Sequence, residues 1–278
     1  MKIFIMTDME GVCGVVNHDD WVLPTGRYYA DGQRLLAEEV NAAVEGFLAA
    51  GATEIVVVDG HGAGGINPSH LNRHTSYVRV FWYPFAIDDS FDAAAWIGQH
   101  GKAGMPYAHI AHTGWFNVLD TQINGISVGE FGEVVLCAEE VGVPSIFGAG
   151  DDAFSREAQA LLPGIETVVT KWGLTAGTGD ECSYEDYMKR NLSARHLHPE
   201  RARELIGEGA YKALIRFGEH PGTFTRLRLT PPYRQVTRLR HTAEEPAKTV
   251  IKEHPSSITA LLNSQGVEQD ESEVSFEL

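Results

Sequence analysis

Acidic residues and histidines stand where short apolar runs of this sequence end. Asp8 and Glu10 follow the first run, His61 follows the second, and His100 follows the third. Glu130 lies in the motif GEFG, where a predicted helix begins. Because the carboxyl ends of parallel strands converge on one crevice of an open α/β sheet, side chains at these positions can meet.

Carboxylates and imidazoles together supply the oxygen and nitrogen ligands that suit Zn²⁺ or a similar divalent ion. Three carboxylates, Asp8, Glu10 and Glu130, could hold two such ions. Without a cation these acids would repel one another in a shared cleft, and bound metal would remove that cost. The pattern therefore predicts a metal site at the ends of the strands.

Each of these residues also has an ordinary structural explanation. Asp8 could form a turn or cap a helix. His61 could be a plain loop residue, and Glu130 could complement the positive end of a helix. The constellation favours a metal site more strongly than any one member does.

The glycine-rich segment DGHGAGG, residues 59–65, lacks the lysine and the spacing of phosphate-binding loops. We expect its glycines instead to let the backbone bend close to a bound ion or substrate. Asp59 in this segment is expected to orient His61 or its loop through a hydrogen bond rather than to bind metal.

His109 and His112 lie three residues apart in the segment after His100. In a helix they would share a face and could bind metal, whereas in a loop one of them could approach a substrate as a proton-transfer group. Their spacing leaves both possibilities open. Six other histidines have no obvious partners and are expected at the surface: His18, His70, His74, His220, His241 and His254.

The elements that must position these residues alternate between strands and helices. Apolar residues at helical spacing predict a helix over residues 31–49, and the β-branched run TEIVVV predicts a central parallel strand over 53–58. The remaining strands of this part are predicted at 2–7, 93–97, 144–147 and 167–170, and the remaining helices at 128–141 and 152–162. The alternation predicts an α/β fold, with a mostly parallel sheet and flanking helices.

The pattern changes in a polar, glycine-bearing stretch, residues 175–183, where we place the domain boundary. We expect an α/β metal-binding catalytic domain over 1–173, a smaller α+β C-terminal domain over 192–278, and an inserted linker or loop between them. A proline at the favoured first helical position, Pro199, opens a predicted helix that runs to about Phe217. Strands are expected at 223–229, 235–239 and 248–252, followed by a short helix from residue 256.

The acidic balance of the 278-residue chain argues against some classes of partner. Its formal net charge is −16, whereas binding to nucleic acid or to anionic membranes needs clustered basic residues. The N-terminus has no long apolar stretch that would be typical of a signal peptide or membrane span. Three scattered cysteines are too few for a disulfide framework. We therefore expect a cytoplasmic protein with free thiols and with neither nucleic acid nor membrane as a partner.

Six segments occur in a characteristic order along the chain: MKIFIMTDMEGVCGV, EEVNAAVEGFLAAGATEIVVVDGHG, IGQHGKAG, IAHTG, ISVGEFGE and VGVPSIFGAGDD. This series resembles the DppA-like D-aminopeptidases, the M55 metallopeptidase family. KWG at residues 171–173 and ARHLHPERARELI after Ser193 extend the resemblance to about Phe217.

The resemblance implies a dinuclear zinc site with five ligands, of which Asp8 bridges the two ions: Asp8, Glu10, His61, His100 and Glu130. It implies that His112 is the catalytic nucleophile or base, with His109 as the rival. It further implies hydrolysis of the bond after the N-terminal residue of a small peptide substrate, such as D-Ala-D-Ala, in a ring-like homo-oligomer such as a decamer.

Two regions depart from the family pattern. The stretch 174–191 looks inserted, and the strands expected after Thr223 resemble the family only loosely. Because loops and second domains often shape a substrate pocket, the resemblance does not determine the substrate specificity. Two other functions stay open from the residues alone. One is a metal-dependent hydrolase of other small amides, esters or phosphoesters, and the other is a non-catalytic α/β ligand-binding protein.

Overall fold

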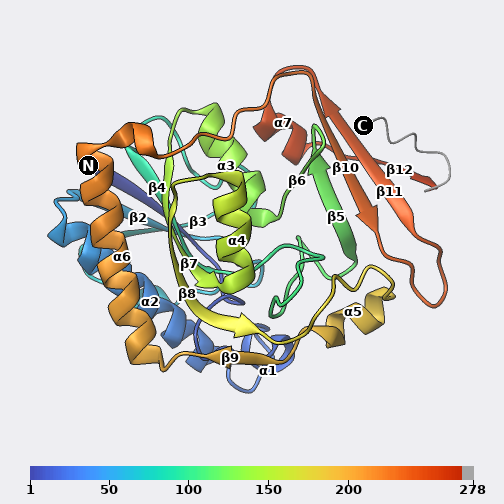
Figure 1. Cartoon of the computed structure of the whole chain (residues 1–278), viewed down its shortest axis with the longest axis horizontal. Coiled ribbons are helices and arrows are strands. Elements are labelled where there is room, and N and C mark those ends of the chain that lie inside the picture. The colour runs from blue at the N-terminus through green and yellow to red at the C-terminus, as the bar shows by residue number, and fades with distance from the viewer. Residues whose placement is uncertain (271–278) are drawn as a thin grey trace.

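Two sheets organise the fold, which we describe for residues 1–270 of a computed structural model (Figure 1). The first sheet has the order β3-β2-β1-β4-β7-β8-β9, and its neighbours pair in parallel except at β9, which is antiparallel to β8. The strand bounds are β1 (Lys2–Thr7), β2 (Glu54–Asp59), β3 (Ser76–Arg79), β4 (Ala93–Gln99), β7 (Ser145–Asp151), β8 (Glu166–Gly173) and β9 (Ala194–His196).

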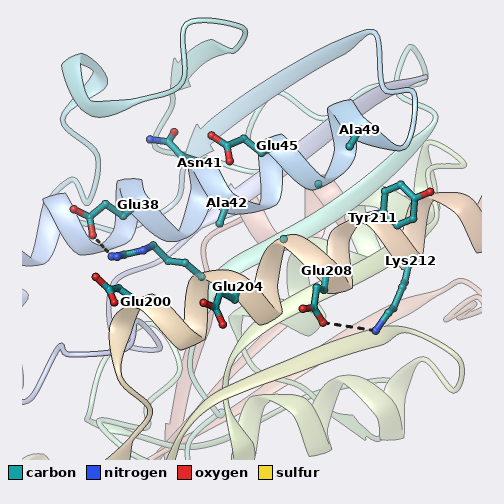
Figure 2. A pocket seen from close by; sticks show the side chains of 13 residues that line it. Glu38, Asn41, Ala42, Glu45, Ala49, Glu200, Glu204, Glu208, Tyr211 and Lys212 are labelled. Atoms are coloured by element: carbon teal, nitrogen blue, oxygen red, sulfur yellow. Dashed lines mark hydrogen bonds and ion pairs between the residues drawn. The ribbon is translucent and has the colours of Figure 1, made fainter.

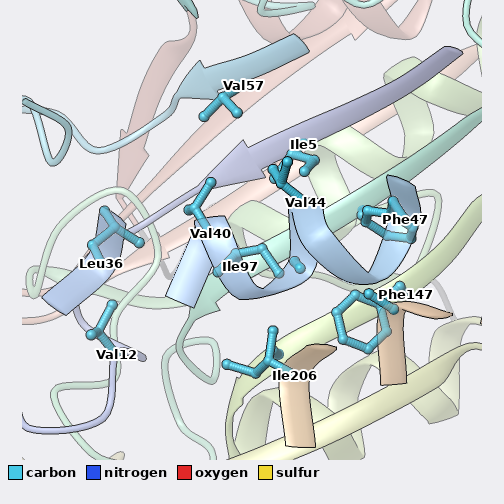
Figure 3. Close-up of a cluster of buried hydrophobic side chains, with 14 of the residues drawn as sticks. Ile5, Val12, Leu36, Val40, Val44, Phe47, Val57, Ile97, Phe147 and Ile206 are labelled. Atoms are coloured by element: carbon cyan, nitrogen blue, oxygen red, sulfur yellow. The ribbon is translucent and has the colours of Figure 1, made fainter. Parts of the chain in front are cut away.

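Helices cover both faces of this sheet. Side chains of β1 alternate between the faces, so that Ile3 and Ile5 join one hydrophobic cluster and Phe4 and Met6 join another. The first cluster contains residues of α2 (Tyr29–Ala49) and α6 (Pro199–Glu219), and Figure 3 shows it. The second contains residues of α3 (Glu130–Glu140) and α4 (Asp152–Leu161). The predicted α/β fold, with a mostly parallel sheet covered on both faces, is confirmed.

The second sheet is antiparallel, with the order β12-β11-β10-β5-β6. It consists of β5 (Val118–Ile123), β6 (Ile126–Ser127), β10 (Tyr233–Leu239), β11 (Lys248–His254) and β12 (Val267–Asp270). The helix α7 (Ile258–Asn263) packs between this sheet and α3. The shorter helices are α1 (His18–Trp21) and α5 (Tyr184–Arg190), with 3-10 turns η1 (Pro68–His70) and η2 (Pro221–Thr223).

Each of the two sheets contains strands from both expected domains. β5 and β6 come from the first expected domain but belong to the second sheet, whereas β9 and α6 come from the second expected domain but pack with the first sheet. The expected domains 1–173 and 192–278 therefore do not coincide with the division into sheets. Residues 271–278 of the second expected domain lie outside the described residues.

The strand expected at residues 223–229 is wrong. After η2 this segment has no regular secondary structure. Its apolar residues are drawn into different places, since Phe224 packs in the first hydrophobic cluster and Leu227 in the second. Arg226 is held by Glu139 of α3, with Nε 2.6 Å from Oε2. The segment therefore bridges the two clusters instead of pairing with a strand.

The helices α2 and α6 cross closely, and a groove of about 970 Å³ lies along their crossing (Figure 2). The basic side chains of the groove are paired, Arg203 with Glu38 and Lys212 with Glu208. None of the candidate metal-binding or catalytic residues lines this groove. Within residues 1–270, no helix is long and apolar enough to cross a membrane.

We expect the substitution Gly46→Ala to destabilise the helix crossing. A Cβ atom at Gly46 would lie 2.3 Å from the carbonyl oxygen of Gly207, so the two helices would have to separate. Overpacking of this kind lowers the free energy of unfolding by about 1–3 kcal/mol, which chemical denaturation can measure. The matched control is Gly218→Ala in α6, where the nearest side-chain atom, Met1 Cε, is 3.7 Å away. It should leave stability unchanged or slightly raised. Equal stability of the two variants would contradict this account.

Candidate metal centre

The candidate residues meet where the order of the first sheet reverses its direction. From β1 the chain moves outward to β2 and β3 on one side, and it later fills the other side with β4, β7 and β8. Ligands of open α/β sheets bind at such switch points. Asp8 follows β1 and His100 follows the neighbouring β4. Gly98 allows the close approach, because its φ is +77° and a Cβ there would lie 2.0 Å from the Asp8 carbonyl oxygen.

The side chain of Asp8 lies between two histidines. Its Oδ1 is 3.2 Å from His61 Nδ1, and its Oδ2 is 3.2 Å from His100 Nε2. Glu10 Oε2 is 3.4 Å from the same His61 Nδ1, and Glu130 Oε1 is 3.9 Å from the same His100 Nε2. The five residues expected as metal ligands are thus brought together, and all except Glu130 are buried.

The two histidines have hydrogen-bond acceptors on both ring nitrogens. His61 Nε2 lies 3.1 Å from the carbonyl oxygen of Val22, and His100 Nδ1 lies 3.0 Å from that of Gly101. A neutral imidazole has only one N–H and can serve only one of its two acceptors. The inner nitrogen of each ring, which faces the carboxylates, must therefore carry either a second proton or a metal cation. Backbone carbonyls that hold the outer N–H in this way are typical of metal-bound histidines.

The electrostatics of the cluster without metal also call for positive charge at the inner nitrogens. Burial by itself would lower the pKa of His61, but Glu10 and Asp8 outweigh it and raise that pKa well above its ordinary value. The pKa of His100 is raised in the same way, against the effect of burial, chiefly by Asp8. Burial would raise the pKa of Asp8, yet hydrogen bonds from His100 and His61 hold it below its usual range. Protons on the histidines thus neutralise the acids, a role that a divalent cation can take over.

Glu10 provides a further test of whether metal fits. Its side chain is 2% exposed, and the positive group nearest its Oε2 atom is His61 Nδ1, which lies 3.4 Å away and makes no hydrogen bond of good geometry with it. A buried carboxylate oxygen left in this way is costly unless a cation or donor reaches it. The side chains of Asp8, Glu10 and His100 each offer a ligand atom within 4.8 Å of the others. The donor set therefore fits a divalent ion with nitrogen and oxygen ligands.

His112 lies against the same cluster. Its Nδ1 is 2.9 Å from the Ile110 carbonyl oxygen, its Nε2 is 3.6 Å from Glu130 Oε1, and its ring stacks on His100 with centroids 4.2 Å apart. Burial and the neighbouring positive charge of His100 lower its pKa. The ring is therefore neutral, with its Nε2 lone pair facing the cluster. His100, His112 and Glu130 also form a possible ligand group, so the position suits both proton transfer and metal binding.

His109 lies elsewhere, although it belongs to the same loop. The segment is not helical, and its loop is tied to the stretch 174–191 by the Ile110 N–H, which donates to the Asn191 carbonyl oxygen at 2.8 Å. The His109 side chain is fully buried, with Nε2 3.0 Å from the Val16 carbonyl oxygen and its ring edge against His196. Burial, aided by the charge of Lys171, lowers its pKa to about 2. Two cavities, of about 120 and 210 Å³, open at the cluster of candidate metal ligands, and His109 lines neither of them.

Asp59 holds the glycine-rich loop that carries His61. Its carboxylate accepts the backbone N–H of Gly65 at 2.9 Å and of Ile66 at 3.1 Å. Arg79 pairs with Asp59 at 3.0 Å and also donates to the carbonyl oxygen of His61 at 3.1 Å. Asp59 thus acts on the loop and makes no direct hydrogen bond to the His61 ring.

Sequence reasoning missed part of the wall of the site. A cavity of about 120 Å³ at the cluster is lined by His18 and Trp115 as well as by the candidate residues. His18 was expected at the surface, which is wrong: it is 4% exposed and packs edge-on against the Trp115 ring. Trp115 Nε1 donates to the Tyr184 hydroxyl at 3.0 Å, so the expected insertion reaches the site. No spacing in the sequence signals these contacts, because they join three distant segments.

The sequence pattern does not indicate a role for Lys171 either. It is completely buried, and its Nζ donates to the backbone carbonyl oxygens of Glu10 and Val15. Burial lowers its pKa to about 8. Lys171 therefore fixes the backbone of the loop that presents Glu10 to the cluster.

Fold and site together define an α/β protein with a buried histidine and carboxylate centre suited to divalent metal. Residues 1–253 match the model of the M55 peptidase family, described as D-aminopeptidase, and the chain belongs to this family. The expected resemblance is confirmed.

One known sequence and one solved structure are similar to the chain. The D-aminopeptidase of Bacillus subtilis (strain 168) is 31% identical over 177 residues, which make up 62% of this chain and 64% of that protein. The alignment thus spans less than two thirds of the relative's length. The solved structure of the Zn-dependent D-aminopeptidase DppA from Bacillus subtilis, a self-compartmentalizing protease, matches over 94% of each chain with a TM-score of 0.78 and 23% identity. This second similarity supports the fold.

We expect Asp59→Asn to weaken metal binding without abolishing it. The amide would replace one of the two oxygens that hold the loop N–H groups and Arg79, so His61 would be less well placed. Loss of such supporting contacts typically costs about 10–100-fold in metal affinity, which a competitive chelator titration measures. The exposed Asp89→Asn is the matched control and should leave the affinity unchanged. Complete loss of metal in Asp59→Asn would make Asp59 a direct ligand instead.

Proposed function

We propose that this protein is a metal-dependent aminopeptidase, which hydrolyses the N-terminal peptide bond of short peptides through a dinuclear zinc site. D-amino-acid peptides such as D-Ala-D-Ala are the proposed substrates. The observation that carries the proposal is the pair of buried histidines, each with acceptors on both ring nitrogens around the Asp8 carboxylate. Membership of a family described as D-aminopeptidase supports the reaction class.

The proposed ligands divide into two groups around Asp8. Its Oδ1 faces His61 and its Oδ2 faces His100, which is the arrangement expected of a carboxylate that bridges two ions. Glu10 would complete the group on the His61 side, and Glu130 the group on the His100 side. Two ions, rather than one, would then neutralise the three carboxylates.

The chemistry that two bound ions would supply is polarisation of the scissile carbonyl and activation of a water molecule. The chain itself would move the proton. The neutral His112 has its Nε2 lone pair toward the cluster, and its Nδ1–H is held by the Ile110 carbonyl oxygen. In this orientation His112 can accept a proton from the attacking water and deliver it to the leaving amine. Trp115 and His18 would limit the access of other water molecules to this reaction.

For the assembled protein we propose a ring-like homo-oligomer, such as a decamer. The support is the structural relative, which is a self-compartmentalizing protease. A cytoplasmic location stays a prediction from the sequence.

The first test counts the metal. We expect elemental analysis after dialysis to find about two divalent ions per chain, and chelation to abolish peptide hydrolysis. Asp8→Asn should lose most of this metal and the activity, because it removes the shared ligand. Asp19→Asn, whose side chain is 84% exposed, should retain both. A metal-free native protein whose activity is indifferent to chelator would overturn the proposal.

The second test separates His112 from the ligands. His112→Ala should keep its metal, while kcat falls by roughly 10² to 10⁴ because a positioned proton-transfer group is lost. His109→Ala should cost much less in kcat, since His109 lies outside the cavities at the cluster. Both metal content and kcat are measured on both variants. A demetallated His112→Ala protein would identify His112 as a ligand, and a fully active one would leave it only a structural role.

A further inference from the structure

A second cavity, of about 210 Å³, opens beside the metal centre. It shares Asp8, Gly62, Gly114 and Glu130 with the smaller cavity at the cluster, so the two are continuous at the reacting groups. We call this second cavity the aromatic pocket, after three rings in its wall. The other residues that line it are Met6, Thr7, Gly60, Tyr83, Phe85, Trp96, Gln99 and Val134.

Contacts within the protein itself hold the aromatic side chains of this pocket in place. Trp96 is completely buried in β4, where its ring packs edge-on against Phe131 with centroids 5.1 Å apart. Tyr83 and Phe85 pack edge-on against each other at 5.0 Å, and the Tyr83 hydroxyl donates to Glu133 Oε2 at 2.5 Å. A pocket with apolar walls and fixed rings is the usual form of a site for an apolar group.

One feature of the wall is costly to the protein unless it serves a ligand. Phe85 and Ala86 both adopt positive φ values, 57° and 65°, in the left-handed region that favours glycine. Backbone strain of this kind is concentrated at active sites and at segments that hold a ligand. The loop that places Phe85 in the wall is such a segment.

The chemistry of an aminopeptidase determines which group of the substrate reaches this pocket. The α-carbon of the first residue carries the free amine, the scissile carbonyl and the side chain. When the carbonyl is held at the metal centre, the first atom of this side chain is only two bonds from the carbonyl carbon, and the pocket begins at Asp8 and Glu130 themselves. A methyl group is about as large as a water molecule, which occupies about 30 Å³ in the liquid. The methyl group of alanine would therefore fill little of the 210 Å³ of this pocket.

We propose that the aromatic pocket binds the side chain of the N-terminal residue, and that the enzyme prefers a residue with a large apolar side chain, such as leucine or phenylalanine, over alanine. This inference rests on the proposed aminopeptidase function and ranks its substrates: D-Ala-D-Ala is hydrolysed, but less efficiently than a dipeptide whose first residue has a larger apolar side chain. Phe85 is then a specificity-determining residue. One methylene in an apolar pocket changes kcat/KM by about 10–200-fold, so the preference over alanine should be at least about 10-fold.

The test uses the zinc-loaded full chain and dipeptides with alanine at the second position. The first residue is alanine, leucine or phenylalanine, each as the D and the L form. In the accepted stereochemical series, kcat/KM should be at least about 10-fold higher for leucine or phenylalanine than for alanine. Phe85→Ala should lower this ratio about 10-fold, mainly through KM, and Phe85→Leu should lower it less. Phe81→Ala on the same loop is the matched control, because Phe81 is 68% exposed and outside the pocket.

The outcomes distinguish this inference from the function on which it rests. Metal-dependent hydrolysis with alanine preferred, or with equal ratios in the Phe85 and Phe81 variants, overturns the inference and leaves the aminopeptidase function standing. If the zinc-loaded protein hydrolyses none of the dipeptides, the proposed function fails, and the inference fails with it. A ratio that responds to Phe85 alone supports both.

Discussion

The burial of negative charge at the end of β1 is the constraint on which the site depends. Asp8 and Glu10 are 5% and 2% exposed, and the effective penalty for burying an uncompensated ion is several kcal/mol. Positive charge must therefore reach them. In the protein without metal it comes from protons on His61 and His100, whose pKa values are raised for this reason. The backbone carbonyls behind both rings keep the outer N–H groups occupied, so a cation that replaces the inner protons meets nitrogen lone pairs already oriented toward it.

The fold brings these groups together through the order of its first sheet. β1 lies between β2 and β4, so the residues that follow these three strands are neighbours although they are well separated in sequence. Supporting residues then fix each piece: Asp59 holds the loop of His61, and Lys171 holds the backbone of Glu10. None of the five clustered side chains belongs to the second sheet or to α5. Through Tyr184 and Trp115, α5 instead helps to shape the space in which a substrate would lie.

Much of the first sheet could be predicted from sequence, because its signals are local. The β-branched run of β2 and the proline that opens α6 each report on a few adjacent residues, and both predictions match the elements found. Polar residues after strands also located four of the five clustered side chains, Asp8, Glu10, His61 and His100, because parallel strands place their carboxyl ends along one edge of the sheet. The fifth, Glu130, begins α3. Periodicity does not report which sheet a strand joins. The pairing of β5 with β10 joins segments that are far apart in sequence, and it depends on packing that the sequence pattern does not display. The same limit explains the error at residues 223–229 and the surface location expected for His18.

We propose that the buried cluster holds two ions with only nitrogen and oxygen ligands. X-ray absorption at the zinc edge of the zinc-loaded full chain tests it most directly. We expect nitrogen and oxygen neighbours at about 2.0–2.1 Å, together with scattering from a second zinc at about 3.5–4 Å. A sulfur neighbour at about 2.3 Å, or a spectrum without metal–metal scattering in protein that carries its full zinc complement, would contradict the claim.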